Sequence, residues 1–205
     1  MAYTYTAWSV VFGEQPSASK WNIIGTNMAS VDERIGSNFS SGTASPIWWE
    51  ELDRDVLGVA GDTLSVSFTT RKFLRFDVFA QDTGGTIRAL LRFNGDSGNN
   101  YSIRESTNGA ADATTTSTSG LQMDAAAVAN PVVAFAEVGH IAGDEKPVYG
   151  RSVIAGTAGA GNLPQRREFA GKWANTADAI TSATVTNSGS GDYAIGATLV
   201  VRGHD

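Results

Sequence analysis

From residue 47 onward, apolar and polar positions alternate with a period of two, the pattern of half-buried β-strands. In the first such run Leu64, Val66 and Phe68 share one face. Glycine, asparagine or proline separates the runs, which are Thr63–Thr70, Lys72–Ala80, Thr86–Phe93, Tyr101–Glu105, Thr114–Met123, Val132–Ile141, Pro147–Ala155, Gln165–Trp173, Ile180–Thr186 and Tyr193–Arg202. Many short strands with no second helix predict a mainly β domain over 47–205, a sandwich of jelly-roll type.

The apolar side of these runs predicts the core of the sandwich. Alternate residues of a strand share a face, so large apolar side chains on that side are expected to point inward. The residues predicted to do so are Phe68, Phe76, Phe93, Val133, Phe135 and Trp173.

One helix is predicted, over 17–36, starting after Pro16 and stopping at Gly36. Its apolar residues recur at spacings of three and four, a heptad seam narrower than an ordinary core-facing stripe. This oligomerisation seam consists of Trp21, Ile24, Met28, Val31 and Ile35. We expect it to join copies of the chain, with a homotrimer as the expected assembly; the alternative is a helix lying on its own domain.

The first sixteen residues predict an extended arm, because aromatic and apolar residues alternate along them. An unpaired strand of this kind recruits a partner strand, which suits attachment to a neighbouring protein. The attachment residues are Tyr3, Tyr5, Trp8, Val10 and Phe12. The competing interpretation is that the arm pairs within its own trimer. The Gly-, Ser- and Thr-rich stretch 37–46 predicts a linker between helix and sandwich.

Composition argues against several partners. The net charge is −6, and the basic clusters Arg71–Arg75 and Arg166–Arg167 lack the interleaved aromatics of a nucleic-acid platform. Polar and charged residues interrupt the most apolar segment, Ala125–Ile141, so no membrane insertion is expected. No basic residue precedes an apolar stretch in Met1–Trp8, so no secretory signal is expected. The chain has no cysteine, and we expect no metal and no cofactor.

The residue types for catalysis are sparse, and we expect no enzyme. Of the two histidines, His140 ends a predicted strand and His204 is the penultimate residue, which is hard to hold in place. A glycosidase needs only two carboxylates at a set distance, and 50–55 supplies four. Trp48 and Trp49 precede this acidic stretch. They are candidate glycan contacts, or they seal the edge of the domain.

Three phrases resemble segments of bacteriophage virion proteins. The segment Phe12–Asn27, with its Lys-Trp-Asn, is similar to the start of tail-fibre and related proteins. Leu91–Ser102 resembles the "RFNGDxGxNY" phrase of their jelly-roll modules, read here as a tight hairpin turn between Phe93 and Tyr101 rather than a calcium loop. Trp173–Gly203 resembles their closing hairpin, although it ends Val-Arg-Gly where the family has Leu-Tyr-Gly.

The resemblance implies a non-enzymatic virion structural protein on the surface of a phage particle. It would be a trimeric fibre, spike or capsid decoration, anchored through its N-terminus to a capsid or tail protein. Capsid and tail both remain open. The alternative is a carbohydrate-binding module that recognises a host surface glycan, as in a tail-tip adhesin. A third hypothesis is a capsular glycan depolymerase.

Overall fold

The computed structural model of the chain describes residues 49–125 and 129–205. The predicted arm, oligomerisation helix and linker, together with Trp48, lie outside them. The described ranges form twelve strands and no helix. The strands are β1 Glu50–Val56, β2 Thr63–Ser67, β3 Phe73–Ala80, β4 Ala89–Phe93, β5 Tyr101–Thr107, β6 Ala113–Thr118, β7 Leu121–Gln122, β8 Val132–Gly139, β9 Lys146–Ile154, β10 Gln165–Trp173, β11 Ser182–Asn187 and β12 Thr198–His204.

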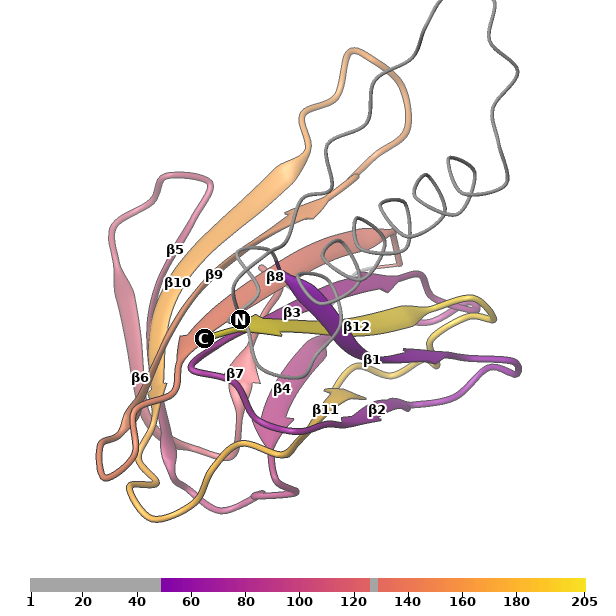
Figure 1. Cartoon of the computed structure of the whole chain (residues 1–205). Helices are drawn as coiled ribbons and strands as arrows, with labels where there is room; N and C mark the ends of the chain where they lie inside the picture. The colour runs from indigo at the N-terminus through magenta and orange to yellow at the C-terminus, as the bar shows by residue number, and fades with distance from the viewer. Residues whose placement is uncertain (1–48, 126–128) are drawn as a thin grey trace, which may run out of the picture. The chain divides into compact units, whose positions relative to one another are not determined.

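The strands form two antiparallel sheets packed as a β-sandwich, which confirms the predicted class (Figure 1). The larger sheet has eight strands in the order β1-β12-β3-β8-β9-β10-β5-β6, and the smaller has four in the order β2-β11-β4-β7. Because the larger sheet is twice as wide, its last strands extend past the cover of the smaller one. All residues of β6 but the last are exposed, as expected for an uncovered edge.

The strand pairing is nested. The chain's first strand, β1, pairs with its last, β12; β2 pairs with β11, β3 with β8, and β4 with β7. Two further contacts join these pairs into sheets, β12 with β3 and β11 with β4. The hairpins β5–β6 and β9–β10 are additions to this pattern, and both widen the larger sheet.

An aromatic cluster fills the space between the sheets. Phe76, Phe93 and Trp173 are fully buried, as predicted, and Phe68 is half-buried with its ring 6.0 Å from that of Phe76. Tyr101 completes the cluster, and its hydroxyl accepts the Phe93 N–H at 2.9 Å. Burying each of these side chains contributes about 1.5–3 kcal/mol, so the cluster makes a substantial contribution to the stability of the sandwich.

Two predicted core residues point outward instead. Val133 and Phe135 lie on the outer side of β8, and the buried positions are Val132, Ala134 and Ala136. The inner side of β8 carries alanine at 134 and 136, and the bulky Phe169 ring lies over the inner side of the neighbouring strand β9. In the adjoining strand a Cβ at Gly150 would collide with the Phe169 ring. The prediction failed because it assigned the larger residues of an evenly apolar run to the inside.

The segments Leu91–Ser102 and Trp173–Gly203, which were both predicted to be hairpins, instead connect strands of different sheets. β4 belongs to the smaller sheet and β5 to the larger, and the same holds for β11 and β12. The segment between β4 and β5 is nevertheless a tight turn, because Asn94 and Gly95 have φ values of 51° and 68°. The turn types expected from Asn-Gly are therefore present, but they redirect the chain to the opposite sheet.

The carboxylate of Asp96 holds this turn in place. It accepts hydrogen bonds from the Trp173 indole at 2.7 Å and from the N–H of Gly98 at 2.9 Å, and Asn100 donates to it as well. Burial alone would raise the pKa of Asp96, but these hydrogen bonds outweigh burial and lower it. With its oxygens engaged in this way, the carboxylate acts as a structural anchor for the turn.

Candidate functional site

One side of the larger sheet faces away from the smaller sheet and is here called the outer face. Its side chains depart from the usual polar composition of an exposed sheet face. Strand alternation normally makes such a face uniformly polar. Here charged, apolar and aromatic side chains lie in separate bands across the strands. All the hollows discussed below open on this face. We therefore treat it as the candidate functional surface.

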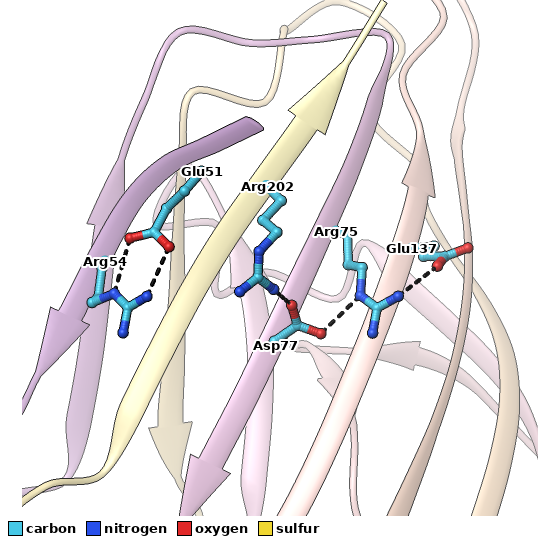
Figure 2. Close-up of polar contacts among 6 residues, drawn as sticks. All are labelled: Glu51, Arg54, Arg75, Asp77, Glu137 and Arg202. Carbon is cyan, nitrogen blue, oxygen red and sulfur yellow. Dashed lines mark hydrogen bonds and ion pairs between the residues drawn. The ribbon is translucent and has the colours of Figure 1, made fainter. Parts of the chain in front are cut away.

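A charge network crosses the middle of the outer face (Figure 2). Asp77 on β3 lies at its centre and accepts hydrogen bonds from Arg75 at 2.8 Å and from Arg202 on β12. Arg75 also reaches Glu137 on β8, 3.4 Å away. Three strands are thus connected by alternating positive and negative groups.

The network has a second part on β1. Arg54 forms a two-pronged contact with Glu51, with Nε–Oε1 at 2.9 Å and Nη2–Oε2 at 2.7 Å. The hydrogen bond from Arg54 lowers the pKa of Glu51, and the same contact raises that of Arg54. The charge network, Glu51, Arg54, Arg75, Asp77, Glu137 and Arg202, therefore contains three cations and three anions.

Two arginines explain why Phe135 points outward. The guanidinium of Arg75 lies 4.6 Å from the centroid of the Phe135 ring, and that of Arg151 lies 4.8 Å from it. Cations near an aromatic face are attracted to its negative charge distribution. The ring thus joins the charge network to β9.

Beside the charge network lies an apolar row. Val56, Phe79, Val133 and Val153 occur in one register on β1, β3, β8 and β9, with Thr198 of β12 completing the line. About half of each apolar side chain in this row is exposed. A shallow hollow of about 200 Å³ separates the row from the charge network.

A separate group of three surface rings lies on the outer face at the end opposite the apolar row. His204 stacks on Phe73 with the ring centroids 4.8 Å apart, and Trp49 approaches the same imidazole edge-on at 4.6 Å. His204, on β12, is therefore held between the rings of Phe73 and Trp49. This contradicts the expectation that a penultimate histidine is hard to hold in place. Trp49, one of the two candidate glycan contacts, is about one-third exposed and packs on this histidine.

A second hollow, which the sequence did not predict, surrounds Tyr149 on β9. It measures about 190 Å³ and lies over β5, β9 and β10. Half of the Tyr149 side chain is exposed. Polar side chains surround the ring, among them Arg104, which pairs with Asp112 at 3.4 Å, and Glu168. Cross-strand pairing brings these residues together from distant parts of the sequence, so no local sequence motif predicts the hollow.

The aspartates among the candidate catalytic carboxylates connect the two sheets. Asp55 accepts the N–H of Ser65 at 2.7 Å, and Asp53 accepts that of Ser67 at 2.8 Å. These N–H groups lie on β2, the edge strand of the smaller sheet, where unpaired donors would otherwise attract foreign strands. The sequence pattern predicts no strand here, but this part of the acidic stretch forms β1 and protects the edge of the smaller sheet.

His140, the other histidine, is held by a backbone contact and does not lie among the outer-face residues described above. His140 follows β8, donates its backbone N–H to the Lys72 carbonyl at 2.8 Å, and has its pKa lowered by burial. Within 49–125 and 129–205, no three metal-ligating acidic or histidine side chains gather. The same ranges contain no helix long and apolar enough to cross a membrane.

Replacing Asp77 by asparagine is expected to lower the free energy of unfolding by about 1 kcal/mol, because two arginines lose their shared anion. The loss should shrink in 1 M salt, where the Debye length is only about 3 Å. Urea denaturation at low and high salt measures both effects. Asp112→Asn is the matched control, since its single pair with Arg104 is more exposed and should cost less. Equal losses in the two variants would contradict a cooperative network.

Comparison of the chain with known protein families, curated proteins and solved structures finds no match.

Proposed function

We propose that this chain is a structural protein of a bacteriophage particle, a homotrimeric spike or decoration. Its N-terminal segment would attach to a capsid or tail protein, and its sandwich would project from the surface. The observation that carries the proposal is the nested strand pairing.

The nested pairing supports the assignment of the sandwich as a jelly roll. Without the two added hairpins, the eight remaining strands pair first with last, second with second-last, and so on to the central pair. A chain folded as one long hairpin and then wrapped into two sheets has this arrangement. Jelly rolls of eight strands recur in viral capsid proteins and lectins, so the topology favours these two classes.

A contact between two of the sequence phrases supports the virion resemblance. Asp96 lies in the Leu91–Ser102 phrase, and Trp173 begins the C-terminal one. Their hydrogen bond of 2.7 Å and the stacking of Trp173 on Tyr101 place both phrases in one structural unit. The resemblance therefore covers residues that depend on one another rather than scattered matches.

The trimer is tested through the oligomerisation seam. Wild-type protein at micromolar concentration should have the mass of three chains by light scattering. Replacing Ile24 and Val31 together with aspartate should dissociate it, because each lost apolar contact removes about 1.5–3 kcal/mol before the cost of burying charge is added. A monomeric wild type would overturn the trimer, and a dimer would overturn its symmetry.

Attachment is tested by deleting residues 2–12. The truncated protein should remain an equally stable trimer but should no longer co-purify with phage particles. A sharp fall in melting temperature would show that the arm belongs to the trimer's own fold. Particle binding that survives the deletion would place the attachment elsewhere in the chain.

The Tyr149 hollow favours glycan recognition as a second candidate function. An exposed aromatic ring beside carboxylate and guanidinium groups offers a sugar both a stacking surface and planar hydrogen-bonding partners. Tyr149→Ala should abolish binding on a glycan array, and Phe73→Ala should retain it. Release of reducing ends from a bound polysaccharide would instead favour a depolymerase.

A further inference from the structure

We propose that the apolar row of the outer face is the surface through which the sandwiches of neighbouring copies contact one another. This inference rests on the proposed trimer and names a second contact in it besides the oligomerisation seam. The occupant is a second copy of this chain.

Four of the five positions in the row are apolar, on a face where strand alternation favours polar residues, and the fifth, Thr198, donates its hydroxyl to the Gly196 carbonyl at 2.9 Å. Its members face one another across paired strands, Val56 on Thr198, Thr198 on Phe79, Phe79 on Val133, and Val133 on Val153. Exposed fractions of 46–58% for the four apolar residues leave much of each side chain in water. Contiguous apolar surface of this kind marks an interaction site, whereas scattered single residues do not.

The charge network next to the row suits a partner with the same surface. Its three cations and three anions lie side by side across the strands, with Arg151 beyond Phe135, so neighbouring copies around a three-fold axis can set arginines of one against carboxylates of the next. A partner of one charge sign would meet both attractive and repulsive groups in similar number. The balance therefore favours self-association over a polyanionic or polycationic partner.

The size of the surface is adequate for a weak but specific contact. The row crosses five strands, about 24 Å at the usual strand spacing, and an eight-residue strand extends about 27 Å. A contact that included the charge network beside the row would therefore cover up to roughly 650 Å², against the ~800 Å² per partner of a standard interface. Such a surface can form a stable contact when another connection holds the copies close.

The predicted linker provides that connection. Its ten residues, 37–46, span at most about 36 Å even when fully extended. Copies joined through the seam would thus keep their sandwiches at high effective concentration, where a modest interface becomes occupied. The linker enters the larger sheet through β1, the strand that carries Val56 at its far end.

The absence of native cysteine allows a direct test in the full-length protein. Val133→Cys places one thiol on the row, and Ile141→Cys places one beyond the far end of β8 as the matched control. The two original side chains are similarly exposed, at 58% and 52%. In the trimer, the thiol at position 133 should react with a maleimide at least ten-fold more slowly than the thiol at 141. In the Ile24→Asp, Val31→Asp variant, the rates should become equal.

The outcomes separate this inference from the proposed function. A trimer with equal thiol rates at the two positions overturns the interface and leaves the trimer intact. A monomeric wild type overturns both. Slow reaction at position 133 that persists in the dissociated variant would show that the chain's own N-terminal segment covers the row, which also overturns the inference. Val133→Asp should weaken assembly at least ten-fold in dilution experiments, with Ile141→Asp unchanged, and equal dissociation of the two would contradict it.

Discussion

Replacing Phe76 by alanine is expected to lower the free energy of unfolding by about 3–5 kcal/mol. The side chain is fully buried at the centre of the sandwich, and its ring lies 6.0 Å from that of Phe68 and 5.5 Å from that of Phe93. Truncation removes the transfer free energy of the ring and leaves a cavity that the two sheets cannot close. Urea denaturation followed by tryptophan fluorescence measures the loss.

Phe73→Ala, three residues earlier on the same strand, is the matched control. Phe73 points to the outer face, is 40% exposed, and contacts mainly His204. Its truncation should cost about 1 kcal/mol, because much of the ring is already in water. Similar losses in the two variants would show that the inward and outward sides of β3 had been exchanged.

β3 also shows how far the sequence predicts this fold. Phe73, Phe76 and Phe79 are spaced by three, so strand alternation must place the central ring opposite to the other two. The polar residues Arg75 and Asp77 share the side of Phe73 and Phe79, which marks that side as the outer face. Phe76 was predicted correctly, since Leu74, Val78 and Ala80 share its side. A full strand of consistent alternation therefore determines the inner face.

β8 shows where the same reasoning fails. Its sequence is apolar at both parities over Val132–Ala136, so alternation carries no direction there. Space decided the inner side at Ala136, because the Phe169 ring fills the inner side of its cross-strand partner Gly150. The outer position of Phe135 was decided by Arg75 and Arg151, which come from two other strands. Neither influence is local, and neither can be read from the run itself.

The outer face could not have been assembled from the sequence for the same reason. Arg75 and Glu137 are 62 residues apart, and Asp77 and Arg202 are 125 apart. Each appears in the sequence as an ordinary polar residue of an alternating strand. Only the order of strands in the larger sheet makes them neighbours. The acidic stretch 50–55 stands out in the sequence, but its aspartates bind the edge of β2, and the charge network centres on Asp77 instead.

Lowering the pH from 7 to 4 is expected to stabilise the sandwich through one buried carboxyl group. Asp124, two residues after the end of β7, is fully buried. Burial raises its pKa to about 6 despite hydrogen bonds from the Ala89 N–H at 2.8 Å and the Gln122 amide at 2.7 Å. Arg167 lies close by, but its guanidinium donates to the backbone carbonyl of Asp124. The carboxylate thus has no ion pair with this arginine.

The sign follows from comparing the folded and unfolded states. The unfolded pKa is the ordinary value of 3.8, below the folded value of about 6. Protonation therefore favours the folded state. The contribution is fully present below pH 4 and is lost as the pH rises to 6. A difference of about two pKa units corresponds to about 3 kcal/mol.

The effect is isolated by comparing wild-type protein with Asp124→Asn in urea denaturation from pH 4 to pH 7. Asparagine does not titrate, so the free energy of unfolding of the wild type relative to the variant should fall by about 3 kcal/mol across this range. Glu51→Gln provides a control of opposite sign, because Arg54 lowers the pKa of Glu51 and its contribution is lost as the pH falls. A constant difference between wild type and Asp124→Asn would show that water or a cation reaches the carboxylate, and that burial does not govern its charge.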